Sequence, residues 1–143
     1  MIRKPFDPDA FLANDPPARE AVKACFNGFG VELLDNPDKY GVDLVSQDGQ
    51  IKVEVERRPA WPGGRFPYET VHIPARKIRI LGDGTAAYAI VSADLASIGT
   101  IGGFQLFEHL MRDPKESFNK CVGEGELFYD VPVSAFEWFD AGK

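Results

Sequence analysis

Three carboxylates on two neighbouring predicted strands are the residues of this chain best placed to do chemistry. Asp43 belongs to the first strand, and Glu54 and Glu56 belong to the second. The dipeptide Asp48-Gly49 between the strands favours a two-residue type I′ hairpin turn. In that register Asp43 lies directly opposite Glu54, where like charges with Cβ atoms roughly 5 Å apart destabilise a sheet. A divalent cation held by both carboxylates would remove this repulsion, so the hairpin predicts a metal site.

The other face of the hairpin is apolar, and Val42, Val53 and Val55 are predicted to face a core. An ordinary explanation of the carboxylates stays open beside the metal site. Strands with one solvated face often carry charged residues, and Lys52 or Arg58 would neutralise the cluster as simple ion pairs. The order of the elements around the hairpin therefore carries as much weight as the residues themselves.

The sequence Asp43 followed by Glu54-Val55-Glu56 resembles the motif of the PD-(D/E)xK nuclease superfamily, and the similarity spans residues 16–93. In that family an Asp on one strand and an Asp/Glu-x-Lys on the next bind a metal ion. This chain has Val42 at the motif's Pro position and Glu56 at its Lys position. The resemblance implies an α/β fold with a mixed sheet. Its restriction-endonuclease-like core would be a helix, three antiparallel strands, a second helix and a further strand.

The resemblance also implies a reaction, the metal-dependent hydrolysis of DNA phosphodiester bonds by an endonuclease. Asp43 and Glu54 would hold Mg²⁺ or Mn²⁺, which suit oxygen ligands. Glu56 would be a second-metal ligand or a general base. The ammonium that stabilises charge on the phosphate would come from Lys52 on the same strand face or from Lys77 in the next helical segment. These five residues are the expected catalytic residues.

The distribution of charge favours nucleic acid as a partner, although the whole chain has a net charge of −6. Residues 50–79 hold seven basic and three acidic residues, whereas the rest holds nine basic and nineteen acidic ones. A basic segment around the carboxylate strand is typical of a phosphate-binding face. Balance of the acidic cluster is the alternative reading. Trp61, on a proline-rich loop, adds a stacking surface, so the expected nucleic-acid-binding residues are Arg57, Arg58, Trp61, Arg65 and Arg76.

The remaining pattern predicts one domain over residues 15–143, preceded by a loosely held arm at 1–14. A helix is expected to start at Asp15-Pro16, and Phe104–Met111 is expected to be a helix with Phe104 and Met111 inward. The predicted strands cover residues 68–73, 86–91 and 126–131, the last at a sheet edge because Pro132 follows it. Residues 75–81 are predicted as a short helix, residues 98–103 as a loop and residues 134–139 as a closing helix or turn.

No apolar stretch is long enough to span a bilayer, the first residues lack a signal-peptide core, and two cysteines form no scaffold pattern. These observations predict a cytoplasmic protein without a membrane partner. A homodimer and a protein partner stay open. Two rival functions stay open. One is a nuclease-fold module that binds nucleic acid without cutting it. The other is a small accessory or inhibitor protein, of the kind that phages and mobile elements carry, which docks on another protein.

Overall fold

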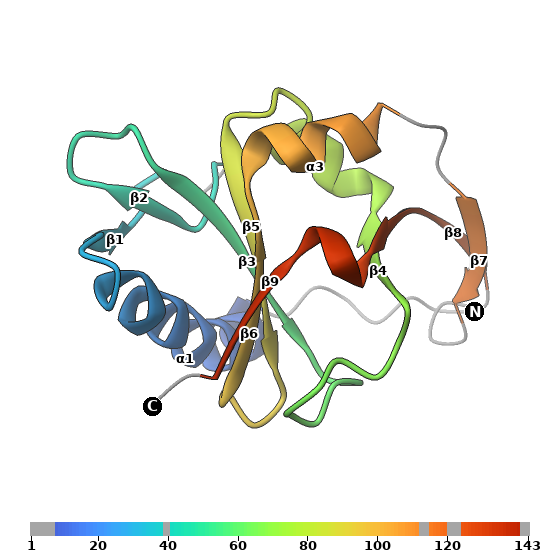
Figure 1. Ribbon diagram of the computed structural model, residues 1–143, viewed down its shortest axis with the longest axis horizontal. Helices are drawn as coiled ribbons and strands as arrows, with labels where there is room; N and C mark the ends of the chain where they lie inside the picture. The colour runs from blue at the N-terminus through green and yellow to red at the C-terminus, as the bar shows by residue number, and fades with distance from the viewer. Residues whose placement is uncertain (1–7, 39–40, 112–114, 120–123, 141–143) are drawn as a thin grey trace.

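A six-stranded mixed sheet forms the centre of the fold in the computed structural model, which describes residues 8–38, 41–111, 115–119 and 124–140 (Figure 1). Its strands lie in the order β1-β2-β3-β5-β6-β9, and only β3 and β5 run parallel to each other. The chain is therefore a mixed α/β protein. The strands of this sheet are β1 (Leu33–Asp35), β2 (Leu44–Ser46), β3 (Lys52–Arg58), β5 (Ala86–Ser92), β6 (Ser97–Ile101) and β9 (Glu137–Asp140).

A second, three-stranded antiparallel sheet has the order β4-β8-β7 and lies beside the first (Figure 1). It consists of β4 (Thr70–Pro74), β7 (Lys115–Asn119) and β8 (Glu124–Pro132). Strand β8 lies in the middle, so the edge position expected for residues 126–131 is wrong. The helical elements are α1 (Pro8–Asn27), the 3-10 turns η1 (Ala75–Lys77) and η2 (Val133–Ala135), α2 (Ile78–Leu81) and α3 (Gly103–Leu110).

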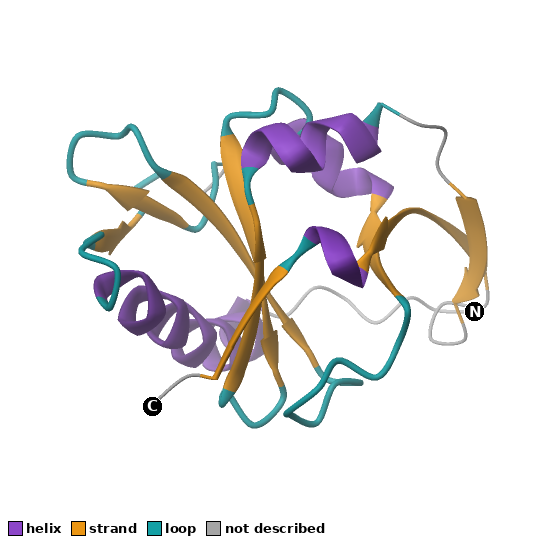
Figure 2. Cartoon of the chain, in the orientation of Figure 1, coloured by secondary structure: helices purple, strands orange, loops and turns teal. Residues whose placement is uncertain are grey.

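Helix α1 covers one face of the large sheet, while α2, α3 and the small sheet lie on the other side (Figure 2). The α1 face is closed by Ala18 and Val22, which pack with Val53 and Val55. Strand β5 contributes to both cores because it is apolar on both faces. Its Tyr88 belongs to the cluster on the side of α2 and α3, and its Ala89 belongs to the α1 cluster. No helix within the described ranges is long and apolar enough to cross a membrane.

The β2–β3 hairpin has the register that the sequence predicts, with Leu44 opposite Val53 and Val45 opposite Lys52. The turn differs from the expected type I′, because φ is positive at Gly49 and not at Asp48. The Asp48 carboxylate accepts hydrogen bonds from the Ser46 hydroxyl at 2.6 Å and from the Gln50 amide at 3.0 Å. The side chain of Asp48 thus organises a longer turn that preserves the same strand pairing.

Three further expectations about the elements are corrected by the structure. Helix α1 begins at Pro8 rather than at Asp15, with Pro16 and Pro17 inside it, so residues 8–14 of the expected arm are helical and residues 1–7 lie outside the described residues. The strand expected at 68–73 forms as β4, but it belongs to the small sheet and not to the sheet that contains the β2–β3 hairpin. Residues 98–103 are not a loop, because β6 runs to Ile101 and continues the large sheet.

Trp61 is a core residue and not an exposed stacking surface, which corrects the prediction from the proline-rich loop. Its side chain is 1% exposed, and its Nε1 donates a hydrogen bond to the Gly64 carbonyl at 3.1 Å. Its ring packs edge-on against Phe66 at 5.3 Å and against Trp138 at 5.6 Å between centroids. These partners bury Trp61 even though prolines flank it in the sequence.

Replacing this side chain should therefore destabilise the folded protein rather than remove a contact with a ligand. We expect Trp61→Ala to lower the free energy of unfolding by about 3–5 kcal/mol, the usual cost of emptying a large aromatic site in a core. Urea unfolding followed by circular dichroism measures the loss. Phe104→Ala is the matched control, because Phe104 on α3 is 82% exposed and not inward as expected. Equal stability of the Trp61→Ala variant and the parent protein would contradict the core assignment.

Candidate functional site

Asp43 and Glu54 lie together, as the hairpin register predicts. Asp43 comes immediately before β2, and its carboxylate Oδ2 accepts a hydrogen bond from the Val55 amide of β3 at 2.8 Å. The Val42 carbonyl accepts instead from Asn36 Nδ2 at 2.9 Å. The backbone ladder therefore stops at Leu44, and the carboxylate of Asp43 continues it. Val42 packs in the cluster on the Glu54 side of the sheet, so the expectation that it faces the α1 core with Val53 and Val55 is wrong.

Glu54 is the most buried acidic residue of the site, with 3% of its surface exposed. Its Oε2 accepts a hydrogen bond from Lys77 Nζ at 2.5 Å. Its Oε1 is buried and, while Asp43 is ionised, has no hydrogen-bond donor among the described residues. Because a buried ionised oxygen without a donor is costly, a proton or a cation between the two carboxyl groups is the natural partner of this atom.

The Asp43 carboxyl group is the place where that proton is held. Burial, then the charge of Glu54 and a hydrogen bond between the two carboxyl groups, raise the pKa of Asp43 to about 7. The Val55 amide and the Lys77 ammonium act in the opposite direction but do not cancel these effects. With Asp43 protonated the three side chains carry no net charge, and with Asp43 ionised they carry one negative charge.

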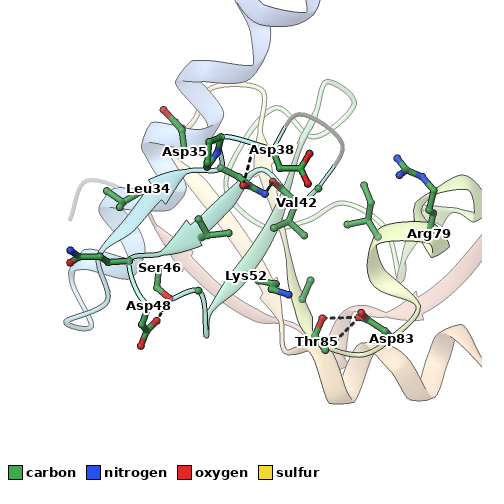
Figure 3. A pocket seen from close by; sticks show the side chains of 18 residues that line it. Leu34, Asp35, Asp38, Val42, Ser46, Asp48, Lys52, Arg79, Asp83 and Thr85 are labelled. Carbon is green, nitrogen blue, oxygen red and sulfur yellow. Dashed lines mark hydrogen bonds between the residues drawn. The ribbon is translucent and has the colours of Figure 1, made fainter.

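Lys77 is the lysine that the fold brings to the carboxylates, and Lys52 is not. Lys77 ends η1, directly after β4, and its side chain is largely buried against Glu54. Lys52 is exposed and lines a cleft of about 690 Å³ between the β2–β3 hairpin and α2. Figure 3 shows Lys52 on the sheet side of this cleft and Arg79 on the helix side. Neither Asp43 nor Glu54 lines the cleft, which also contains Asp35, Asp38, Asp48 and Asp83.

Glu56 belongs to a second buried network on the same strand face. Its Oε2 accepts hydrogen bonds from the Tyr88 hydroxyl and from Arg58 Nη2, the latter at 3.5 Å. Arg58 Nη2 also donates to Tyr88 Oη at 2.8 Å and to the His72 carbonyl at 2.6 Å. Burial and the charge of Glu56 raise the pKa of Tyr88 well above its ordinary value, so the hydroxyl keeps the proton that it donates.

The predicted nucleic-acid-binding residues do not converge on one face. Arg58 is engaged in the Glu56 network and Trp61 is in the core, so neither is a free contact for phosphate or base. Arg57 follows Val53 and Val55 on the α1 face by alternation, and its Nη2 donates to the Ala93 carbonyl at 2.5 Å. Arg65 and Arg76 are exposed. The basic segment of the sequence is therefore partly an internal balance of the acidic residues, which is the alternative that the sequence left open.

Sequence reasoning missed Tyr88 as a member of these networks. Tyr88 lies in the apolar run of β5 and pairs with Glu54 in the parallel register of β3 and β5. A tyrosine in a strand buried on both faces needs a hydrogen-bond partner for its hydroxyl. This requirement could have identified Tyr88 from the sequence, because the neighbouring strand β3 carries carboxylates on one face.

The donor set of Asp43 and Glu54 suits a hard divalent cation. Mg²⁺ commonly uses one or two protein carboxylates and takes its other ligands from water or phosphate, and the orphaned Glu54 Oε1 is an oxygen that lacks a positive partner. In the described part of the chain no three His, Cys, Asp or Glu side chains form a group that could hold a metal. The fit is therefore to an ion held by two carboxylates and not to a closed protein cage.

Comparisons of the chain with protein-family models, with curated proteins and with solved structures find no match. The geometry of the site is therefore the basis on which a function is inferred.

The pKa of Asp43 predicts how stability depends on pH when a chelator is present. Between about pH 4 and pH 7 the folded protein holds a proton at Asp43 that the unfolded chain has lost. The contribution of Asp43 to the free energy of unfolding is therefore present at low pH and is lost as pH rises toward 7. The free energy of unfolding falls by up to about 1.4 kcal/mol per pH unit in this range. We expect Asp43→Asn to remove this decline, which urea unfolding at a series of pH values measures.

Asp48→Asn is the control, because its effect has the opposite sign. A hydrogen bond from the Ser46 hydroxyl, then one from the Gln50 amide, lowers the pKa of Asp48. The stability that Asp48 contributes is present above its ordinary pKa and is lost on acidification, so its replacement leaves the slope toward pH 7 unchanged. A parent protein and an Asp43→Asn variant with the same slope would show that Asp43 ionises normally.

Proposed function

We propose that the protein is a metal-dependent nuclease that hydrolyses DNA phosphodiester bonds. The observation that carries the proposal is the joining of Asp43, Glu54 and Lys77 in one buried cluster from three separate elements. Two carboxylates for a divalent cation and one ammonium for a phosphate are the parts that metal-assisted phosphoryl transfer uses.

The position of Lys77 supports a nuclease despite the missing lysine of the motif. The resemblance requires an ammonium beside the second carboxylate, and Glu56 stands where the motif has Lys. Lys77 Nζ reaches Glu54 from η1 instead. The order α1, antiparallel β1-β2-β3, α2 and then β5 also agrees with a restriction-endonuclease-like core, with β4 inserted before α2. This finer fold assignment belongs to the proposal, as does the location of the protein in the cytoplasm.

In this proposal Asp43 and Glu54 hold Mg²⁺ or Mn²⁺. When bound, the ion polarises the phosphate and lowers the pKa of a coordinated water. The Val55 amide fixes the orientation of the Asp43 carboxylate through Oδ2. Lys77 neutralises Glu54 in the free protein, and its ammonium would be the donor to a phosphate oxygen of the substrate. Glu56 Oε2 is already engaged by Tyr88 and Arg58, so Glu56 suits electrostatic positioning better than the role of general base.

A non-catalytic nucleic-acid-binding module is the second candidate, and one observation favours it. Lys77 already neutralises Glu54, and Asp43 is uncharged while it holds its proton. The cluster therefore carries no net charge without any ion while Asp43 is protonated. The two candidates predict different results for the same substitutions.

We expect Lys77→Met to lower the rate of DNA cleavage about 100-fold or more, the usual effect of removing one donor to a developing charge. Binding of Mn²⁺ should survive, because both carboxylates remain, and the ion should still raise the melting temperature. Asp43→Asn should abolish cleavage and the Mn²⁺-dependent rise together. Cleavage of branched, single-stranded and duplex DNA with Mg²⁺, Mn²⁺ and chelator gives the first readout, and calorimetry gives the second.

Lys23→Met is the control for the loss of a lysine, since Lys23 on α1 pairs with Glu20 and Asp35 and its loss should change neither readout. Lys77→Gln, which keeps an N–H donor for Glu54, serves if Lys77→Met does not fold. A parent protein that neither cuts DNA nor melts differently with Mn²⁺ would favour the binding module. Loss of cleavage in Lys52→Met but not in Lys77→Met would assign the catalytic ammonium to Lys52.

A further inference from the structure

A pocket of about 360 Å³ lies at the end of β3 opposite to the large cleft. Its volume is within the range of small-molecule sites, which begins near 300 Å³. We call it the aromatic pocket. Its lining includes Arg58, Trp61, Phe66, Tyr68, Thr70 and His72.

The apolar wall of the aromatic pocket is held in place before any ligand binds. Trp61 packs edge-on against Phe66, and Phe66 stacks on Trp138 at 5.4 Å between centroids. Tyr68 packs edge-on against Phe66 at 5.7 Å and remains 56% exposed. The His72 side chain is 52% exposed, and its ring stacks on Phe128 at 4.1 Å. Two rings at the rim are thus supported from behind while much of their surface stays open.

The charged groups around the aromatic pocket already have protein partners, which argues against a phosphate as its occupant. The guanidinium of Arg58 is paired with Glu56 and bonded to Tyr88. The Asp130 carboxylate accepts hydrogen bonds from His72 Nε2 and from Thr70 Oγ1, each at 2.9 Å. The buried Arg58 Nε has no hydrogen-bond partner within the described ranges. A flat, uncharged ring that carries hydrogen-bond acceptors fits these surroundings better than an anion.

The aromatic pocket is in line with the Asp43–Glu54 site. Arg58 follows Glu54 by four residues and lies on the same strand face, so their Cα atoms are about 13 Å apart at ~3.3 Å per residue. The aromatic pocket and the Asp43–Glu54 site are therefore about 13 Å apart along β3, a separation that a short length of nucleic-acid backbone spans.

From these observations we propose that the aromatic pocket binds one unstacked nucleobase of the DNA substrate, so that DNA with an unpaired base is the preferred ligand. This proposal rests on the proposed nuclease function and adds a substrate class to it. Tyr68 and His72 stack on the base, since every base has a π-face and stacking on aromatic side chains tolerates any sequence. A fully paired duplex offers no such base without the cost of unstacking one.

The test measures binding by fluorescence anisotropy, with chelator present to prevent cleavage. Three probes are compared: a short duplex with one unpaired adenine, the same duplex with an abasic unit at that position, and the fully paired duplex. We expect the parent protein to bind the unpaired-adenine probe most tightly. Tyr68→Ala should weaken that binding about 5- to 150-fold, the range for loss of one base–aromatic stack, and should leave the other two probes unaffected. His72→Ala should act in the same direction.

Tyr68→Phe keeps the ring and should bind like the parent, and Phe104→Ala controls for loss of an exposed aromatic on α3. Equal affinity of the parent for the adenine and abasic probes would overturn the proposal, and this comparison needs no protein variant. So would an equal loss on all three probes in Tyr68→Ala. DNA cleavage without preference for the unpaired base would overturn the pocket alone, whereas base-dependent binding without any cleavage would overturn the nuclease function alone.

Discussion

The burial of the Glu54 carboxylate inside the α/β layers is the constraint on which the rest of the structure depends. A buried carboxylate needs a positive partner, because burial removes its hydration and van der Waals contacts alone do not compensate for that loss of free energy. That partner, Lys77, comes from η1, whose place is set by β4. Strand β4 is held by β8 in the small sheet and not by the large sheet. The small sheet therefore fixes the position of the ammonium beside a carboxylate that belongs to the large sheet.

The pairing of β2 with β3 was predicted correctly because side chains alternate between the two faces of a strand, and this alternation determines the register. Leu44 and Val53 must share the apolar face, and their pairing brings Asp43, which precedes Leu44, beside β3. The turn type was not predictable from Asp48-Gly49 alone, since the Ser46 hydroxyl and the Asp48 carboxylate form a turn of their own. The same arrangement recurs where Ser92 bonds to Asp94 before β6, with Leu95 at positive φ in the place of a glycine.

The parts that sequence reasoning missed are those set by distant partners. The pairing of β4 with β8 joins Thr70 to Pro132, and no local pattern records it. The prolines that flank Trp61 led to the prediction that it is exposed, yet Trp138 of β9 packs against it. Gly99 of β6 leaves room for the Trp138 ring, because a Cβ at Gly99 would lie 2.5 Å from that ring. Local propensity reports the loop correctly but says nothing about what packs on the loop from the other end of the chain.

The face of β3 that the sequence suggests is exposed to solvent carries a row of charged side chains, and residues of other elements pair with most of them. Lys52 faces the cleft, Glu54 is met by Lys77, and the last carboxylate of the row is met by Tyr88 and Arg58. Only the Asp43–Glu54 pair is left one positive charge short when both carboxylates ionise. A proton at Asp43 or a divalent cation supplies that charge, and because burial and the charge of Glu54 raise the pKa of Asp43 to about 7, the proton and a cation compete for this site near neutral pH. The same burial that makes the pair costly without a partner is therefore what favours a divalent cation there.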